Sequence, residues 1–377
     1  MIPERQIPTK AFVVEAPGSP FVLRDVVLDE VRDNEVLIEM MYTGLCHTDI
    51  VVQQGAMPVG DFPAVLVRRI GGAVKDKTLQ EGDLVFLSFT SCNSCCACHE
   101  ERNGFCRNMT AISFGGARGI SAVDSPIKSP TGQPFRGQFF GQSSLSKLAI
   151  VSEGSVVKPS TSIIEEDLAS LAPLGCGYLT GAGTILNILK PKPTSCLAVL
   201  GMGAVGLAAL MTARAQGVEN IVAVDIVDAK LELARTLGAS YTLNTKSVAT
   251  LDEGLRALFP GGVDQILDTT GVVALLESSV KALGHEGVLA IVGVAPGGSS
   301  LKIDPLEFMV NCKRIIGAIE GSANPAKLIP QLVDWYKQGK FPVDRLARVY
   351  AADSLDEALE DLHKGKVIKP ILKWTEI

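Results

Sequence analysis

Hydrophobic and polar positions divide the chain into two parts with different patterns. The first part opens with short apolar runs, separated by Gly, Pro and acidic turns, that predict β-strands, and a helical pattern begins only at residue 165. From residue 196 onward, short apolar runs alternate regularly with longer segments rich in helix formers. This alternation predicts a doubly wound parallel sheet, so the fold class is α/β with a β-rich part and a second, parallel-sheet part.

The boundaries follow from these runs. The expected strands of the β-rich part are residues 10–14, 21–27, 35–42, 84–89 and 145–151, with a closing strand at 369–374 that should rejoin them. The expected strands of the second part are residues 197–200, 221–224, 241–243, 263–267, 288–293 and 314–318. The expected helices are residues 165–171, 180–189, 204–216, 229–237, 247–259, 273–283, 325–337 and 355–362.

A glycine-rich turn follows the first strand of the second part. Gly201, Gly203 and Gly206 have the spacing G-x-G-x-x-G, which allows a tight turn, close approach of a pyrophosphate, and close packing of helix on strand. Asp225 ends the next strand, where a carboxylate accepts hydrogen bonds from the adenosine ribose and repels a 2′-phosphate. Together these features predict an NAD(H) site, whereas Asp225 alone would also suit an ordinary strand-end turn.

Four cysteines lie close together in a polar, turn-rich segment. Cys92, Cys95, Cys98 and Cys106 have short spacings that let four thiolates surround one tetrahedral metal ion, and zinc is the expected ion. Four protein ligands leave no open coordination position, so the predicted role of this zinc is structural. Cys96 lies inside the same loop and is interpreted as a bystander.

Composition and charge narrow the class of protein. With 377 residues, 47% of them hydrophobic and 20% charged, the chain is long and apolar enough for a soluble protein of two domains. A net charge of −6 without any basic run argues against nucleic acid as a partner. No apolar stretch is long enough to span a bilayer, and the first residues contain no signal core. We therefore expect a cytoplasmic protein with no membrane partner.

These motifs together resemble the zinc-type medium-chain dehydrogenases, the alcohol dehydrogenase family, and within it the aryl and benzyl alcohol dehydrogenase branch. The resemblance covers nearly the whole chain. It rests on Gly44-Leu45-Cys46-His47-Thr48-Asp49, the four cysteines, Leu174-Gly175-Cys176-Gly177, the glycine turn with Asp225, and Ile319-Glu320-Gly321. It implies a GroES-like catalytic domain at 1–179 and 321–377, with a zinc lobe at 92–106, and a Rossmann NAD-binding domain at 180–320.

The resemblance also assigns residues to the cofactor and to a partner chain. His47 and Lys369 match positions that contact the cofactor pyrophosphate, and Lys230 matches a contact to the cofactor ribose. Relatives pair through the last strand of the cofactor domain, here residues 314–318. The resemblance therefore implies a homodimer or homotetramer that acts on a small-molecule substrate.

For catalysis, the resemblance matches Cys46 and Cys176 to two ligands of a catalytic zinc, and Thr48 to the hydroxyl that exchanges the substrate proton. The chain departs from the family pattern after Leu66, where relatives continue Gly-His-Glu-Gly-x-Gly and supply the histidine ligand. One register is a deletion of about seven residues. The rival register places Arg68 and Arg69 over the His-Glu pair. Both remove the ligand, and because a catalytic zinc needs three protein ligands, we expect this zinc to be lost.

Two functions remain open at this stage. The first is an NAD(H)-dependent oxidoreductase that acts on a bulky or aromatic alcohol or carbonyl compound, or on a polarised C=C bond. It would use either a rebuilt zinc site or zinc-free chemistry in which Thr48 or another hydroxyl donates the proton. The second is a catalytically silent NAD-binding protein, or one that uses a pocket widened by the deletion for non-redox chemistry.

Overall fold

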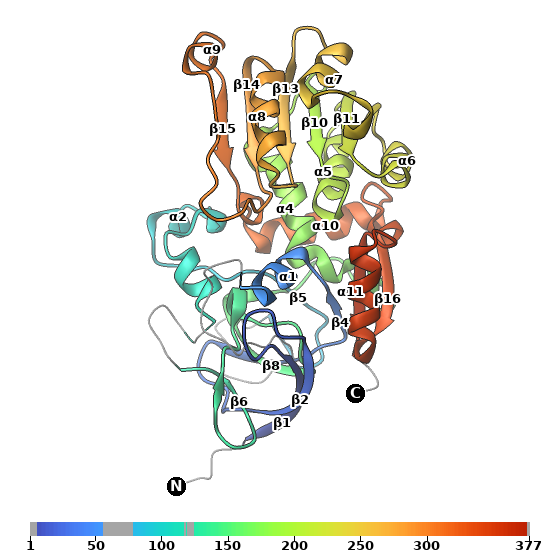
Figure 1. Ribbon diagram of the computed structural model, residues 1–377. Helices are drawn as coiled ribbons and strands as arrows, with labels where there is room; N and C mark the ends of the chain where they lie inside the picture. Colours follow the sequence, from blue (N-terminus) through green and yellow to red (C-terminus); the bar gives the residue numbers. More distant parts are fainter. Residues whose placement is uncertain (1–5, 56–77, 117, 119–123, 375–377) are drawn as a thin grey trace. The chain divides into compact units, whose positions relative to one another are not determined.

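The computed structural model describes residues 6–55, 78–116, 118 and 124–374 (Figure 1). The chain divides into two compact units, and each is built from segments that are not contiguous in sequence. The first unit comprises Met1–Cys176, Asn324–Asp334 and Asp344–Ile377, and the second comprises Gly177–Ala323 and Trp335–Val343. The helix α10 (Pro325–Lys337) contributes to both units.

The second unit contains a six-stranded parallel sheet. Its strands are β10 (Cys196–Leu200), β11 (Asn220–Asp225), β12 (Tyr241–Asn244), β13 (Val263–Asp268), β14 (Leu283–Ile291) and β15 (Arg314–Gly317). Their order is β12-β11-β10-β13-β14-β15, and every pair is parallel. The order reverses direction between β10 and β13, so ligands are expected at the carboxyl ends of these two strands. This is the doubly wound Rossmann sheet that the alternating pattern predicts.

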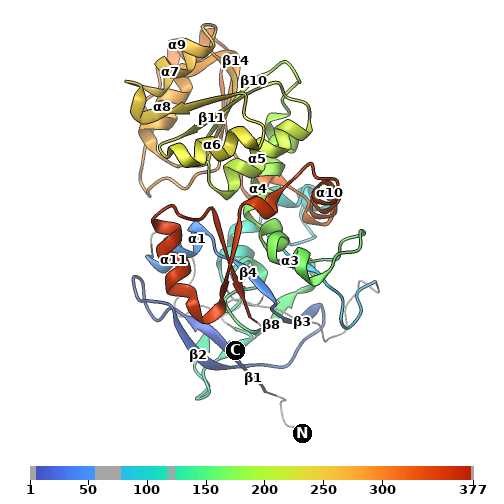
Figure 2. The same cartoon turned by 90° about the vertical axis from the view of Figure 1, so that its right-hand side faces the viewer.

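Helices pack around this sheet (Figures 1 and 2). They include α5 (Ala204–Ala215), α6 (Asp228–Thr236), α7 (Leu251–Leu258) and α8 (Val273–Ala282), while α4 (Gly177–Gly183) packs against α5 and α9 (Pro305–Val310) precedes β15. Because helices cover the sheet, its central strands are buried and read as continuous apolar runs. In β10, for example, Leu197, Val199 and Leu200 have no exposed surface.

The first unit is built mainly from short strands. Its antiparallel pairs join β1 (Ile7–Val13) with β2 (Val22–Leu28), β3 (Glu35–Glu39) with β8 (Leu148–Ser152), and β5 (Phe86–Leu87) with β9 (Val156–Val157). Two further strands, β6 (Ile127–Lys128) and β7 (Pro134–Phe135), extend the β1–β2 sheet. The helices of this unit include α1 (His47–Gln53), α2 (Cys96–His99), α3 (Glu165–Leu171) and α11 (Leu355–His363). This is the GroES-like, β-rich part of the fold.

The closing strand β17 (Lys369–Lys373) returns the chain to the β-rich part, as predicted. It pairs in antiparallel register with β4 (Tyr42–Gly44) and in parallel register with β16 (Ala347–Ala351). The next residue, Trp374, is fully buried, and its indole N–H donates to Thr43 Oγ1 at 2.9 Å. This packing fixes β4, whose end leads directly into Cys46.

Several boundaries differ from the prediction. The expected strand 84–89 is reduced to β5, and the expected helix 180–189 is divided between α4 and a π-helical segment at Thr184–Leu189. The expected strand 35–42 is two strands, because the chain changes partner from β8 to β17 near Met41. The expected helix 247–259 begins only at Leu251, because Thr250 Oγ1 accepts the Glu253 N–H at 3.3 Å and caps the helix there. The strand β14 begins before 288, because Leu283 already pairs with Val263 of β13, and the register shifts between this pair and Val288.

Two predictions remain, one on the altered segment after Leu66 and one on the absence of a membrane span. The altered segment after Leu66, including Arg68 and Arg69, lies outside the described residues. In the part that the structure describes, none of the helices has the length and apolar character needed to cross a membrane.

Candidate functional site

The glycine turn between β10 and α5 has the shape of a phosphate cradle. Gly201 adopts a φ of 89°, which favours glycine, and a Cβ on Gly206 would lie 1.8 Å from the Gly201 carbonyl oxygen. A Cβ on Gly203, in contrast, would meet nothing within 4 Å. No side chain caps the N-terminus of α5. The open space above Gly203 and the uncapped helix N-terminus therefore fit a pyrophosphate.

Asp225 lies beside this turn at the carboxyl end of β11. Its Oδ2 accepts the Met202 N–H at 2.7 Å, and its Oδ1 accepts the N–H groups of Ile226 and Val227 at 2.7 and 3.0 Å. The half-exposed carboxylate thus braces the glycine turn as well as its own strand end. Lys230 lies one turn further on, in α6, and is also half-buried.

A second carboxylate at the carboxyl edge of the sheet was not singled out from the sequence. Asp268 ends β13, is fully buried, and accepts hydrogen bonds from the backbone N–H groups of Thr270 and Gly271 at 3.1 and 2.9 Å. Burial raises the pKa of Asp268, against the opposing effect of these hydrogen bonds. Its side chain therefore holds the loop that follows β13, at the point where the strand order reverses. The signal in the sequence is an Asp at a strand end followed by Thr-Thr-Gly.

In the first unit, the two cysteines at positions 46 and 176 line one cavity of about 100 Å³. Cys46 precedes α1, and its backbone N–H donates to Asp49 Oδ2 at 2.7 Å. Its thiol lies 3.6 Å from Thr48 Oγ1. Lys369 lines the same cavity and donates to the carbonyl oxygen of Leu45. The structure therefore brings Cys46, Cys176, Thr48 and Lys369 together, while His47 is exposed on the first turn of α1.

The charges around this cavity favour a thiolate. A hydrogen bond with Cys176 lowers the pKa of the Cys46 thiol well below its usual value, helped by the positive charge of Lys369 and by Thr48 and opposed by burial. Burial, together with the charge of Cys46, raises the pKa of Asp49 to about 7. The neighbouring lysine and hydroxyl therefore stabilise the thiolate form of Cys46.

The thiol pair by itself does not complete a catalytic zinc site. Such a site needs three protein ligands around the ion. Among the described residues, only the cysteines at 92, 95, 98 and 106 bring three or more potential ligand atoms within 4.8 Å of one another. The donor set around Cys46 and Cys176 in that part of the chain therefore does not fit a catalytic zinc.

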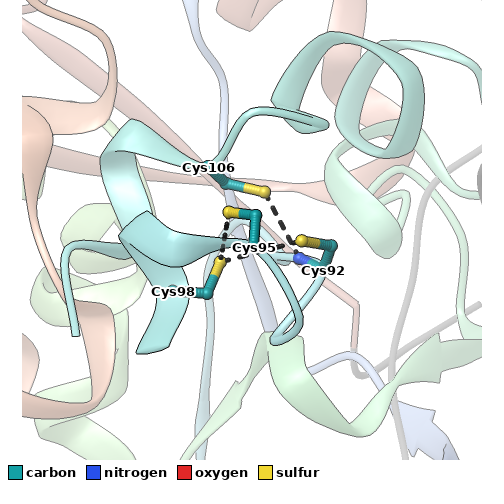
Figure 3. A group of neighbouring side chains, drawn as sticks. All are labelled: Cys92, Cys95, Cys98 and Cys106. Carbon is teal, nitrogen blue, oxygen red and sulfur yellow. Dashed lines mark hydrogen bonds between the residues drawn. The ribbon is translucent and has the colours of Figure 1, made fainter. Parts of the chain in front are cut away.

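The four-cysteine lobe does have the geometry of a metal site (Figure 3). Its four sulfur atoms lie near one another, and Cys98 Sγ is 3.5 Å from Cys95 Sγ and 3.9 Å from Cys92 Sγ. Zn–S bonds of about 2.3 Å in a tetrahedron place sulfur atoms about 3.8 Å apart. The lobe therefore fits one zinc ion, and the exposed Cys96 lies outside the group.

The thiols of this lobe differ in their tendency to ionise. Burial opposes ionisation of Cys92, but hydrogen bonds from Ser94, Cys95 and Cys106 lower its pKa to about 5. Burial and the hydrogen bond with Cys95 raise the pKa of Cys98 to about 12. Cys92 thus ionises more readily than Cys98, and a zinc ion would favour the thiolate form of all four.

Comparison with known proteins gives two family matches. Residues 32–131 match the alcohol dehydrogenase GroES-like domain, and residues 204–338 match the zinc-binding dehydrogenase family. The chain is 35% identical over 371 residues to the geraniol dehydrogenase of Castellaniella defragrans. This match covers 97% of this chain and 98% of that protein.

Two solved structures are also similar over their whole length. One is an alcohol dehydrogenase zinc-binding domain protein from Burkholderia ambifaria, with 36% identity and a TM-score of 0.91 over 98% of this chain and 100% of that chain. The other is the benzyl alcohol dehydrogenase of Acinetobacter calcoaceticus, with 36% identity and a TM-score of 0.89 over 97% of this chain and 99% of that chain.

Proposed function

Because this chain belongs to the zinc-type alcohol dehydrogenase family, we propose that it is an NAD(H)-dependent oxidoreductase that acts on a bulky or aromatic alcohol or carbonyl compound. The observation that carries this proposal is the intact dinucleotide cradle, with open space above Gly203 next to the carboxylate of Asp225. A bound nicotinamide cofactor supplies the hydride acceptor or donor. In the second unit, Gly201, Gly203 and Asp225 would hold it, with Lys230 as a ribose contact.

Apolar side chains such as Phe86 line the cavity of the thiol pair and support an apolar substrate, and a cluster of three phenylalanines includes two from the turn that precedes Gln142. Phe114, Phe139 and Phe140 are half-buried and pack edge to face or tilted, with ring centroids 4.8–5.9 Å apart. Phe139 and Phe140 belong to the turn that also contributes Gln142 to the cavity of the thiol pair. The names of two similar proteins, a geraniol and a benzyl alcohol dehydrogenase, agree with such a substrate.

We further propose that catalysis proceeds without a second zinc ion. The support is the incomplete donor set around Cys46 and Cys176 and the missing His-Glu segment after Leu66. Thr48, whose hydroxyl lies beside the Cys46 thiol, is the proposed proton donor. Because no metal would polarise the substrate oxygen, an acceptor that is already polarised, such as a conjugated C=C bond, suits this site.

A second candidate function is supported by the same incomplete donor set. A chain that binds NAD(H) but lacks the means to polarise an alcohol would be catalytically silent, or would use the cavity for non-redox chemistry. The cofactor cradle argues against silence, because a protein under no demand for hydride transfer has no need to retain both the glycine turn and Asp225.

Two measurements test the proposed function. The first follows NADH absorbance with a panel of benzyl alcohols, aldehydes and enones. We expect turnover that the variant Thr48→Val reduces at least tenfold through loss of the proton donor, whereas Thr131→Val, at an exposed threonine, has no effect. The second counts zinc per chain by elemental analysis, and we expect one ion. Inert protein that binds NADH tightly would favour the silent alternative, and two ions per chain would contradict the zinc-free mechanism.

We also propose that the chain forms a homodimer or homotetramer. In the second unit, β15 is the last strand of the sheet and carries one neighbouring strand, β14. The preceding helix α9 exposes Leu306, Met309 and Val310 at 65%, 65% and 55%. An edge strand next to exposed apolar side chains is suited to pairing with a second copy of the chain.

A further inference from the structure

We propose that the side-chain amide of Gln142 is a substrate-binding group, which hydrogen-bonds the oxygen atom of the alcohol or carbonyl substrate in the cavity of the thiol pair. This inference rests on the proposed function. Gln142 lies outside the dehydrogenase motifs of the sequence, and the inference makes it a polar contact for the reacting oxygen atom.

The first argument is the state of the amide itself. Gln142 lines the cavity together with Cys46 and Cys176. Its Oε1 atom is buried, yet it accepts no hydrogen bond from the described part of the chain. A buried polar atom without a partner destabilises the folded protein, so nearly all such atoms are paired. Once the amide turns to expose this atom to the cavity that Gln142 lines, a substrate hydroxyl would supply the partner that the protein does not.

The second argument is that the backbone holds Gln142 in place at a conformational cost. Three residues around it, Phe140, Gly141 and Ser143, have positive φ values of 57°, 76° and 83°. The turn is closed by two hydrogen bonds, from Phe139 N to Ser143 Oγ at 3.0 Å and from Ser143 N to Phe139 O at 3.1 Å. Strained turns of this kind persist where the surrounding structure enforces them, and they cluster at binding sites.

The same turn is fixed against the body of the first unit. A Cβ on Gly141 would lie 2.6 Å from Thr90 Cγ2, so the backbone packs closely against Thr90. Ser155 Oγ donates to the Gly141 carbonyl oxygen at 3.4 Å. A binding group is most effective when its support is rigid, and these contacts provide that support for Gln142.

The third argument is chemical. An amide carries both an acceptor and two donors, so it can accept from the hydroxyl of an alcohol and donate to the oxygen of a carbonyl compound. The ammonium group of Lys369, which also lines the cavity, already donates to Leu45 O and can only donate. Gln142 can therefore bind the reacting oxygen in either oxidation state.

The test compares two variants with opposite hydrogen-bonding properties. Gln142→Leu removes both donor and acceptor at similar volume, and Gln142→Glu keeps an acceptor of the same shape. We expect Gln142→Leu to raise KM about five- to tenfold for both benzyl alcohol and benzaldehyde, as the loss of a neutral hydrogen bond implies. We expect Gln142→Glu to raise KM for benzyl alcohol less than about threefold, because it retains the acceptor.

A matched control separates binding from folding. Gln138→Leu makes the same change four positions earlier, where the buried amide donates to Ile150 O at 3.4 Å, so it should lower Tm and leave KM unchanged. Calorimetric titration of benzyl alcohol, with no turnover required, gives Kd for each protein. Binding that Gln142→Leu weakens would support the inference even if turnover were absent and the proposed function failed.

Other outcomes would overturn the inference. If the wild-type protein turns over substrate and Gln142→Leu leaves both KM values within twofold, the proposed function stands and the assignment of Gln142 is wrong. Equal losses in the Leu and Glu variants would also refute it, since shape rather than hydrogen bonding would then matter. If the wild-type protein neither binds nor converts any alcohol of the panel, both proposals fail.

Discussion

The carboxylate of Asp225 accepts three backbone hydrogen bonds, from Met202, Ile226 and Val227. An ionised carboxylate has about four acceptor sites, so about one remains for a ligand, on the oxygen that bonds Met202. Asp225 can therefore serve both as a strand-end turn residue and as a cofactor contact, which the sequence analysis treated as alternatives. It closes the strand-end turn, and it keeps a negative charge and one acceptor site beside the cradle of Gly203.

This arrangement predicts the effect of removing the charge. In Asp225→Ser we expect the affinity for NADH to fall by roughly tenfold or more, since hydrogen bonds to charged groups contribute about 1.5–3 kcal/mol. The affinity for NADPH should rise, because the repulsion of the 2′-phosphate is gone. Fluorescence titration with both cofactors measures the ratio of the two Kd values.

The control for Asp225 is a nearby carboxylate of the same charge. Asp228 begins α6 and accepts the Asn244 amide at 2.7 Å, and Asp228→Asn removes one negative charge from the same region. We expect this variant to keep the preference for NADH. An equal change in both variants would mean that general electrostatics, and not a contact of Asp225, decides between the cofactors.

At the scale of single elements, the bounds of segments with a clear period could be predicted from the sequence, and those of two-residue strands could not. The predicted bounds of α3 and α10 agree with the structure, and those of α5 and α8 agree to within one residue at the C-terminus. The two-residue strands β5, β6, β7 and β9 are too short to carry a period of their own. β5 and β9 form because two segments distant in sequence pair, and β6 pairs both with the distant β2 and with its neighbour β7 in a short hairpin.

The same distinction applies to the candidate sites. The glycine turn and the four cysteines are local in sequence, so their spacing was sufficient to predict that they would lie together. Cys46 and Cys176 lie far apart in sequence, and only the family resemblance joined them. Gln142 and Asp268 were missed because their significance depends on burial and on backbone turns, which spacing does not reveal.

The element that contains the four cysteines allows a prediction about metal removal. Cys95→Ser removes one ligand, and since a structural zinc needs four, we expect the zinc content to fall from about one ion per chain to nearly none. The Tm should fall as well, because metal binding stabilises the folded lobe. Elemental analysis and calorimetry measure the two quantities.

A neighbouring cysteine provides the matched control for this lobe. Cys96 is exposed, lies outside the sulfur cluster and follows Cys95 directly, so Cys96→Ser should keep the zinc and the Tm of the wild-type protein. Loss of zinc in both variants would show that Cys96 is a ligand. Zinc retained in Cys95→Ser would contradict a four-cysteine site.

At the scale of the whole molecule, the two units are assembled from the sequence in different ways. The first unit is assembled from both ends of the sequence, since β17 returns to pair with β4. The second unit is made mostly from one internal stretch, Gly177–Ala323, whose parallel sheet ends in the edge strand β15. The first arrangement leaves the C-terminal strand covered on both sides by β4 and β16. The second leaves β15 at an edge of the sheet, with β14 as its one neighbour among the described strands.

The proposed assembly through this edge predicts the effect of charge on α9. In a double variant, Leu306→Glu with Met309→Glu, two carboxylates replace side chains that are each 65% exposed. Burying these charges against a second copy is unfavourable, so we expect the oligomer to dissociate toward a chain of 39.8 kDa. Light scattering coupled to gel filtration measures the mass.

Two features of α9 make this variant a test of assembly and not of folding. The helix is capped by Asp304 Oδ1, which accepts the backbone N–H groups of Leu306 and Glu307 at 2.9 and 3.2 Å, and these bonds do not depend on the replaced side chains. The control Ile164→Glu charges another apolar residue, 58% exposed, in the first unit and should leave the mass unchanged. If the double variant keeps the mass of the wild-type oligomer, the two chains associate through a different surface, and β15 must be protected by its own twist and short length.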